Sequence, residues 1–261
     1  MQNDLRALFN MPPKLAVQYL NNKGYQITWD WYDMLGSTNN RAFTVAKVTS
    51  EDVLQSILQE IQRAQTKGLS FDEFQKALKP RLVEAGWWGK AEVLDGTTGE
   101  LTKVALGSYA RLKTIFQTNM QTAYMAARYQ RFEDNKNDRP YLAYIAVDDG
   151  RTRPAHRKLY EELRGCVVHI DDPIWDVIFP PNGFGCRCRT MAFSLAEVKR
   201  LGLRIVKSQG SEFVPVVLNN EGETAQVQSV KITGNSGKPF AFRPDVGWDY
   251  NPGKQWATGQ V

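Results

Sequence analysis

The chain has 261 residues, of which 42% are hydrophobic and 23% are charged, with 33 Lys and Arg against 28 Asp and Glu. This length predicts one large domain or two smaller ones, and the composition excludes wholesale disorder and a fibrous repeat. No apolar run reaches the roughly 18 residues of a membrane helix, and the start of the chain lacks a signal-peptide pattern, so we expect synthesis in the cytoplasm and no membrane partner.

The first part of the chain, residues 1–102, predicts a mostly helical N-terminal region. Apolar residues recur at helical spacing over 50–68, and Ser50 is placed to cap that helix. Ser70 and Glu73 form a capping-box pattern at the start of a second helix. Because the two helices are separated by only a short connection, we expect them to pack as an antiparallel hairpin.

The longest helical stripe of apolar residues covers 103–134 and predicts a long helix within a connecting segment, 103–140. Residues 141–147 then read as a strand. We assign residues 141–207 to a compact, loop-rich α+β core that bears the motifs described below.

The C-terminal part, residues 208–261, predicts a linker followed by an aromatic tail. Residues 209–238 are rich in Gly, Ser, Asn, Gln and Glu, which is typical of a linker. Residues 239–256 regain aromatic side chains, enough for the tail to dock on another surface. The predicted fold class is α+β, in which a mostly helical N-terminal region precedes the compact core and an extended C-terminal tail.

The positive charge lies in the middle of the chain. Residues 103–207 carry 18 basic and 11 acidic side chains, whereas residues 1–102 carry 11 and 12 and residues 208–261 carry 4 and 5. The net charge is therefore +7 in the middle and −1 in each flank. If a polyanion is bound, the middle segment is the predicted site.

Two cysteines and a histidine could bind a metal ion. Cys186 and Cys188 alternate along the chain, so both thiols of an extended segment can point to one side, and His156 would supply a third zinc ligand. Cys166 or His169 could be the fourth. However, C-x-C is tighter than the usual zinc spacing.

The alternative interpretation of these residues is structural. Buried cysteines behave as small hydrophobic side chains, and His156 could hydrogen-bond a backbone carbonyl or a carboxylate such as Asp148. The sequence favours this interpretation, so we expect no cofactor, with zinc as the alternative. Three cysteines, an odd number, also argue against a disulfide framework.

A catalytic interpretation needs a nucleophile, a base and an orienting acid. Cys186 or Cys188 with His156 and Asp172 could be drawn as such a trio, which would make the protein a nuclease or a toxin-like enzyme. Chance supplies such trios readily, and the sequence has no Walker loop, no G-x-G-x-x-G and no H-E-x-x-H. We therefore expect no enzyme and no catalytic residue.

Four arginines, Arg151, Arg153, Arg187 and Arg189, lie close to chain-reversing Gly and Pro residues. Guanidinium groups match the geometry of phosphate, so these side chains are the candidate DNA contacts. The alternative is internal bracing, for example between Arg151 and one of the aspartates in 171–176.

Other side chains of this segment are expected to order an irregular backbone, and Trp175 would fill a local core. The expected fold-ordering set is Asp148, His156, Gly165, Asp172, Trp175, Pro180, Pro181, Gly183, Cys186 and Cys188.

The run 148–189 resembles the signature of the phage Mu F-like minor head proteins, which are related to the wider head-morphogenesis family of tailed phages. That signature opens with acidic-Arg-Thr-Arg-x-x-His, continues with Pro-x-Trp and closes with Pro-Pro-Asn-Gly-Phe-x-Cys-Arg-Cys. The preceding helix and the Gly-Trp-Asp-Tyr-Asn-Pro-Gly run at 247–253 are also similar. The resemblance thus covers about 103–254.

The resemblance implies a minor capsid protein of a tailed phage or prophage. Such a protein is a virion component inside the phage head, associated with the portal vertex after assembly in the host cytoplasm. It would act in head assembly, and in DNA packaging or ejection, through contacts to portal protein, other head proteins and phage genomic DNA.

One departure from the family bears on zinc. Other branches carry C-x-x-C where this chain has Arg153 and His156, and a His before the C-x-C where it has Gly183 or Phe184. The departures remove ligands from a four-ligand site, so a zinc-stabilised nucleic-acid-binding module remains only an alternative.

Overall fold

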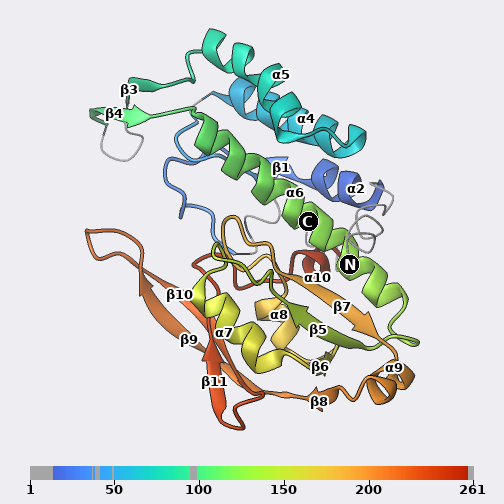
Figure 1. Cartoon of the computed structure of the whole chain (residues 1–261). Coiled ribbons are helices and arrows are strands. Elements are labelled where there is room, and N and C mark those ends of the chain that lie inside the picture. The colour runs from blue at the N-terminus through green and yellow to red at the C-terminus, as the bar shows by residue number, and fades with distance from the viewer. Residues whose placement is uncertain (1–13, 37, 39–41, 49, 95–98, 258–261) are drawn as a thin grey trace.

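The computed structural model describes residues 14–36, 38, 42–48, 50–94 and 99–257. Figure 1 shows two packed parts: a helical part, and a part built on two sheets. The long helix α6 (Tyr109–Asp134) lies between them and contributes to the core of each. The predicted α+β class is confirmed. In the described part of the chain, none of the helices has both the length and the apolar character needed to cross a membrane.

In the described residues, three helices of the helical part pack on α6. The glycine after α4 adopts φ = 65°, a left-handed conformation that costs glycine little, and so allows the chain to turn directly into α5. The predicted antiparallel pair is thereby formed. The helices are α2 (Lys14–Asn22), α4 (Glu51–Lys67) and α5 (Phe71–Glu84).

The two predicted caps differ. Ser70 forms a capping box with Glu73, in which the Ser70 backbone N–H donates to the carboxylate at 2.8 Å and the Glu73 N–H donates to the Ser70 hydroxyl. Ser50 has extended backbone angles, but its side chain makes no capping bond, so that prediction is wrong.

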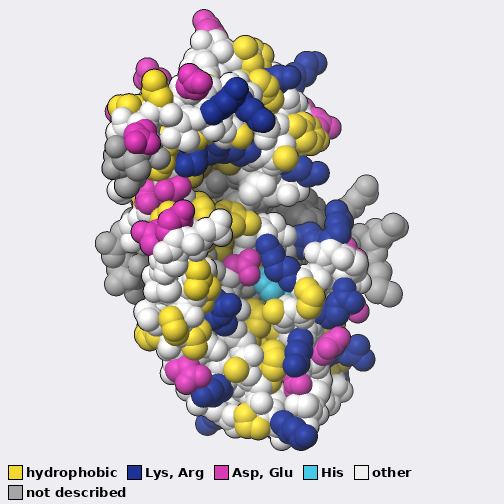
Figure 2. All heavy atoms as spheres, turned by 90° about the vertical axis from the view of Figure 1, so that its left-hand side faces the viewer, with side chains coloured by type: hydrophobic (Ala, Val, Ile, Leu, Met, Phe, Trp, Pro, Cys, Tyr) yellow, Lys and Arg dark blue, Asp and Glu magenta, His cyan; other side chains and the backbone are white. Residues whose placement is uncertain are grey.

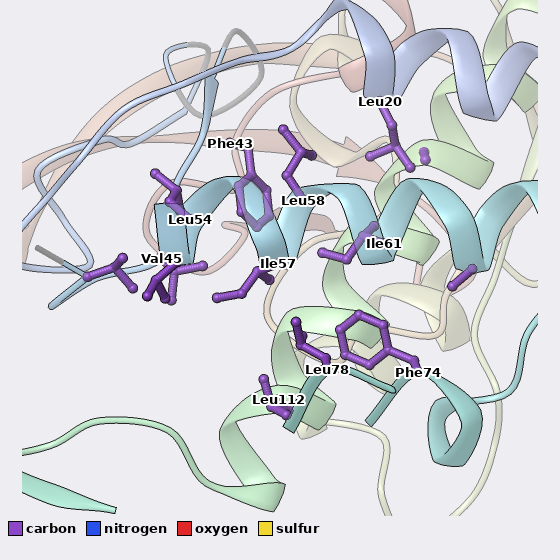
Figure 3. Packing of buried hydrophobic residues seen from close by; sticks show 14 of the residues in the cluster. Leu20, Phe43, Val45, Leu54, Ile57, Leu58, Ile61, Phe74, Leu78 and Leu112 are labelled. Atoms are coloured by element: carbon purple, nitrogen blue, oxygen red, sulfur yellow. The ribbon is translucent and has the colours of Figure 1, made fainter. Parts of the chain in front are cut away.

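The first core joins aliphatic side chains of α4 to those of α5 and α6. Figure 3 shows Ile57 and Ile61 pointing from α4 toward Phe74 and Leu78 of α5, with Leu112 of α6 close by. All five side chains are fully buried. Each contributes roughly 1.5–3 kcal/mol by leaving water, which explains why the apolar spacing alone specifies this part.

A hairpin replaces the predicted start of the long helix. Strands β3 (Lys90–Leu94) and β4 (Leu101–Ala105) pair antiparallel, so the boundary expected between residues 102 and 103 falls inside β4. α6 begins only at its N-cap Ser108, whose hydroxyl accepts from the N–H of Arg111 at 3.2 Å. The preceding Gly107 must be small, because a Cβ there would lie 2.8 Å from the Trp88 ring. With the hairpin in place, α6 begins later in the chain than the predicted start at residue 103.

Two minimal strands, β1 (Gly24–Tyr25) and β2 (Ala42–Phe43), pair parallel within the helical part. The central sheet of the other part has the order β7-β5-β6-β8, with β5 antiparallel to both of its neighbours. Its elements in chain order are β5 (Tyr141–Ile145), α7 (Pro154–Leu163), β6 (Cys166–His169), α8 (Ile174–Ile178), β7 (Arg189–Phe193), α9 (Leu195–Arg200) and β8 (Arg204–Val206).

The predicted linker is a second sheet, which is the largest correction to the predicted fold. Its order is β11-β10-β9, and all its pairs are antiparallel. Val230 and Ile232 of β10 are buried, while Gln228 and Lys231 are less buried. Composition suggested a linker because the polar residues of a sheet exposed on one face dominate it. The strands are β9 (Ser208–Val217), β10 (Thr224–Thr233) and β11 (Pro239–Phe242).

The aromatic tail folds back onto the protein rather than extending from it. Trp248 and Tyr250 are buried, and the Trp256 ring meets Tyr19 of α2 edge-on with centroids 5.9 Å apart. The last helix, α10 (Pro252–Ala257), packs against α6. Docking of the tail is therefore internal in this structure.

Candidate functional site

A second core lies around β5, β6, α8 and β10. Three of the side chains buried there meet one another: those of His156, Cys186 and Cys188. His156 lies in the first turn of α7, and the cysteines lie in the segment that leads into β7. Nδ1 of His156 is 3.6 Å from Sγ of Cys186 and 3.7 Å from Sγ of Cys188. All three side chains are at most 5% exposed. The two thiols thus face the same imidazole.

This arrangement shifts the pKa values of the two thiols in opposite directions. A hydrogen bond from Cys188, followed by contact with His156, holds the pKa of the Cys186 thiol below its ordinary value. The bond with Cys186, together with burial, raises the pKa of Cys188, because a second negative charge beside the first is unfavourable. The site therefore favours one thiolate over two.

The expected bond from His156 to Asp148 does not form. The Asp148 carboxylate is largely exposed and lies 3.7 Å from Nε of Arg157. Instead, His156 packs edge-on against the Phe242 ring of β11, with centroids 5.8 Å apart. The second sheet, which was predicted as a linker, thus helps to orient the imidazole.

The trio of the alternative catalytic interpretation is not assembled. Asp172 accepts backbone hydrogen bonds from Ile174 and Ser208, both at 3.0 Å, and so fixes the turn before α8 and the start of β9. Its carboxylate has no contact with His156 among the described residues. The observed hydrogen bonds of Asp172 are thus to backbone N–H groups and not to an imidazole.

Cys166 and His169 also lie away from the cluster. The Cys166 thiol contacts Arg204 and Asn235, while His169 lies beside Asp171 with Nδ1 3.6 Å from the carboxylate. Both residues belong to β6. In the sheet, β5 lies between β6 and β7, the strand that follows the cysteine segment. Neither lies with the three residues that could hold a metal ion, so the structure does not bring the possible fourth ligand to the cluster.

The loop before α7 is tied to the cysteine segment by an ion pair. Arg187 donates to both carboxylate oxygens of Asp149, at 2.8 and 2.5 Å. This pairing with Arg187 holds the pKa of Asp149 well below its usual range. The expected partner for bracing was an aspartate in 171–176. The observed partner of Arg187 is Asp149, which lies in the loop just before Arg151.

The other three arginines differ in exposure. Arg153 donates to the Phe184 carbonyl at 2.6 Å and lies 3.3 Å from the Asp245 carboxylate. The Nε atom of Arg189 is buried and has no hydrogen-bond partner among the described residues. Arg151 keeps 81% of its side chain exposed, although Asp149 lies 3.7 Å away. Arg151 is therefore the one best placed for an external anion.

Trp175 and the proline pair close the second core. Trp175 is 1% exposed, and its Nε1 donates to the His169 carbonyl at 3.0 Å. Pro180 and Pro181 are buried and joined by a cis peptide bond. Phe184 is 43% exposed and meets the Trp248 ring edge-on.

The two motif glycines serve different needs. Gly165 has φ = 75° and turns the chain from α7 into β6. A Cβ at Gly183 would overlap the carboxylate of Asp245, so this position permits a close approach between the cysteine segment and the tail. Asp245 in turn donates its backbone N–H to the Asn182 carbonyl at 3.0 Å.

Several structural partners were not identified from the sequence. Asn182 is fully buried and donates to the Tyr144 hydroxyl at 3.1 Å. Asn251 donates to the Trp175 carbonyl at 3.1 Å and accepts from the N–H of Gly253 at 3.0 Å. Asn251 lies in the Asn-Pro-Gly run of the tail, which was the available signal for it.

A groove of about 830 Å³ lies between the helical part and the cysteine segment. Its charged lining residues are Lys113, Arg151 and Arg187, with no carboxylate among the described lining residues, and its aromatic lining includes Phe116 and Trp248. The face of the molecule drawn in Figure 2 is mixed in charge, with basic and acidic side chains on both parts. The positive character is thus local to a few side chains.

Comparisons with known proteins identify relatives. Residues 55–191 match the family model described as "Phage Mu protein F like protein". The chain is 42% identical over 253 residues to the putative capsid assembly protein F of Escherichia phage Mu, which covers 96% of this chain and 56% of that protein. It is also 42% identical over 231 residues to the F protein of the Mu-like prophage FluMu of Haemophilus influenzae, covering 87% and 53%.

The chain therefore spans about half the length of the curated relatives it matches. The family match begins within α4, upstream of the segment in which the motif resemblance starts. The comparison with solved structures found no match.

Proposed function

Because the chain belongs to the family of phage Mu protein F-like proteins, we propose that it is a minor head protein that acts in assembly of the head of a tailed phage or prophage. The observation that carries this proposal is the 42% identity, over 96% of the chain, to a relative named for capsid assembly. Identity of that extent includes both parts of the fold, so the role belongs to the whole chain rather than to the motif segment alone.

Within this role, we propose that the protein sits inside the head at the portal vertex, with portal protein and other head proteins as partners. The resemblance of residues 148–189 to the minor head proteins supports this placement. The protein would join the head during assembly in the host cytoplasm.

A contact with phage DNA is the finer part of the proposal. Arg151 is mostly exposed at the edge of the groove, and Lys113 is exposed on α6. Arg153 and Arg187 are held by carboxylates and would brace the fold instead. Since so few cations are free to meet phosphate, binding should be weak and should fall as salt rises.

We propose a binding and assembly role rather than catalysis. His156 is 3% exposed and faces two thiols, and Asp172 is bonded to backbone N–H groups. A general base must reach its substrate, which this buried imidazole does not. If His156→Ala removes a nuclease activity of the purified chain while leaving its melting temperature unchanged, the non-catalytic role is refuted.

Deletion and complementation test the assembly role. A phage lacking this gene should produce few DNA-filled heads, and the wild-type chain supplied in trans should restore them. Normal yields of filled heads without the protein would contradict the proposal.

Mobility-shift assays on linear duplex DNA test the finer part. The double variant Arg151→Ala/Lys113→Ala should weaken any shift at low salt, whereas Lys76→Ala, an exposed cation of α5, should not. A shift that is insensitive to salt and to the double variant, or the absence of any shift, removes DNA from the list of partners.

A further inference from the structure

We infer that His156, Cys186 and Cys188 bind a zinc ion, with a water molecule as fourth ligand. This site lies beyond the assembly role proposed above. Imidazole nitrogen and cysteine sulfur are the donors that zinc prefers in proteins. The ligand atoms of these three residues all lie within 4.8 Å of one another, and all three side chains are buried.

The distances match a tetrahedral zinc site. With Zn–N near 2.0–2.1 Å and Zn–S near 2.3 Å, a tetrahedral angle separates nitrogen from sulfur by roughly 3.5 Å. The observed separations of Nδ1 of His156 from the two sulfurs are 3.6 and 3.7 Å. A metal ion would therefore fit between the three atoms with little movement of the side chains.

Besides the hydrogen bond between Cys186 and Cys188, Nδ1 of His156 can satisfy only one of the two thiols. One imidazole nitrogen offers either a single lone pair or a single hydrogen, so Nδ1 of His156 can make one good hydrogen bond, not two. Cys186 and Cys188 nevertheless lie at nearly equal distances from it. A central cation satisfies all three atoms at once.

The structure leaves space for the fourth ligand. A cavity of about 10 Å³ adjoins the cluster, and its three residues are part of the lining. This volume is close to the space that one water molecule needs. Cys166 and His169 contact other groups, as described above, and no carboxylate lines this cavity among the described residues. Water is therefore the fourth ligand that fits.

Three arginines, Arg151, Arg153 and Arg187, also line this cavity, and two of them are bound by other groups. The Arg187 guanidinium is bound by Asp149, and Arg153 by the Phe184 carbonyl and Asp245. A bound Zn²⁺ would stabilise the second thiolate that is unfavourable in its absence, and two thiolates would cancel its charge, so the occupied site would add no net charge to this region. The arginines then act as supports around the cluster.

The ion would connect two segments that lie about thirty residues apart in the chain. His156 comes from α7, and the cysteines come from the segment before β7, so the ion would join the opening and closing parts of the motif. A metal that binds only the folded chain stabilises the fold. The departures from other branches remove ligands from the sequence pattern, but three donors still converge.

Metal analysis of the chain, purified without chelator and without a metal-binding tag, tests the proposal. We expect about one zinc ion per chain. His156→Ala and Cys188→Ser should each lose most of this zinc. Cys166→Ser is the matched control, since Cys166 is equally buried but outside the cluster, and it should keep the full content.

Cobalt binding to the wild-type chain gives a second readout that does not depend on whether variants fold. Co²⁺ added to the zinc-free protein should produce the visible bands of a tetrahedral site and a thiolate charge-transfer band, and Zn²⁺ should abolish both. Absence of zinc together with absence of these bands would overturn the proposal. So would equal loss of metal from Cys166→Ser and Cys188→Ser.

Discussion

The two cores of this protein are stabilised in different ways. The first, between α2, α4, α5 and α6, consists almost entirely of aliphatic and aromatic side chains at helical spacing. The second surrounds an irregular segment and includes buried polar groups such as His156, Asn182 and Asn251. α6 joins them, since Ala126 belongs to the first core and Tyr129 to the second.

The helical part is specified by its apolar pattern, and the irregular segment by individual side chains. A helical core tolerates exchanges among similar apolar side chains, because volume and pattern decide it. An irregular segment has no repeating hydrogen-bond ladder, so individual side chains must satisfy its backbone. Mutations in the two parts should therefore differ in which residues are critical, and four tests follow from the largest expected effect to the smallest.

Replacement of Trp175 should have the largest effect. Trp175→Ala removes a fully buried indole and its hydrogen bond to His169, and should cost about 3–5 kcal/mol of unfolding free energy. Urea denaturation measures it. Trp31→Ala is the matched control, because Trp31 is 42% exposed in the helical part and should cost far less. Equal losses would mean that the second core is not organised around Trp175.

Lys23 is a buried cation in the helical part. It is 7% exposed, near the Tyr19 ring, and burial lowers its pKa to about 7. A base with a lowered pKa destabilises the fold most below that pKa, so wild-type stability should rise between about pH 7 and 10.5.

Lys23→Met should therefore gain on the order of 3 kcal/mol at pH 7 and progressively less as the pH approaches 10. Denaturation at several pH values measures this gain. Lys76→Met, at an exposed position, should show no such trend. A constant or opposite pH dependence for Lys23→Met would show that the buried amine is not a cost to this core.

Gly253 tests the contact between the tail and the shared helix. A Cβ there would meet the side chain of Tyr129 and lie 2.8 Å from the Ala126 carbonyl oxygen. Gly253→Ala should cost about 1–3 kcal/mol by forcing α10 away from α6. Gly150→Ala, which meets nothing within 4 Å, should change stability little. Thermal unfolding distinguishes the two, and an undisturbed Gly253→Ala would mean that α10 is not closely packed.

Helix caps should give the smallest effect and the same effect in both parts. Ser70 and Ser194 each form a capping box, so Ser70→Ala and Ser194→Ala should each cost about 1 kcal/mol. Ser50→Ala should cost almost nothing, because that hydroxyl makes no cap bond. A loss at Ser50 as large as that at Ser70 would contradict the assignment of the caps.

Helical periodicity made the first part predictable. The pair α4 and α5, the capping box of Ser70 and the mixed α+β class all follow from spacing and composition. The missed elements are short or polar. The hairpin β3–β4 and the sheet β9–β10–β11 have one exposed face, so their polar residues resemble those of a loop.

The residue types of the site could be predicted, but not which side chains pair with one another. The cysteines and His156 could be identified because they lie together in the signature run. Asp149 as the partner of Arg187 and Asp245 as that of Arg153 could not be predicted, because both pairings depend on how loops distant in sequence approach each other. The contribution of Phe242 was hidden by the linker interpretation.

We propose that this chain is a minor component of a phage head. Quantitative mass spectrometry of purified, DNA-filled heads and of separated tails tests it most directly. The account predicts that the chain is present in heads at a small fraction of the major capsid protein and is absent from tails. Heads that lack the chain, although the infected host produces it, would contradict the account.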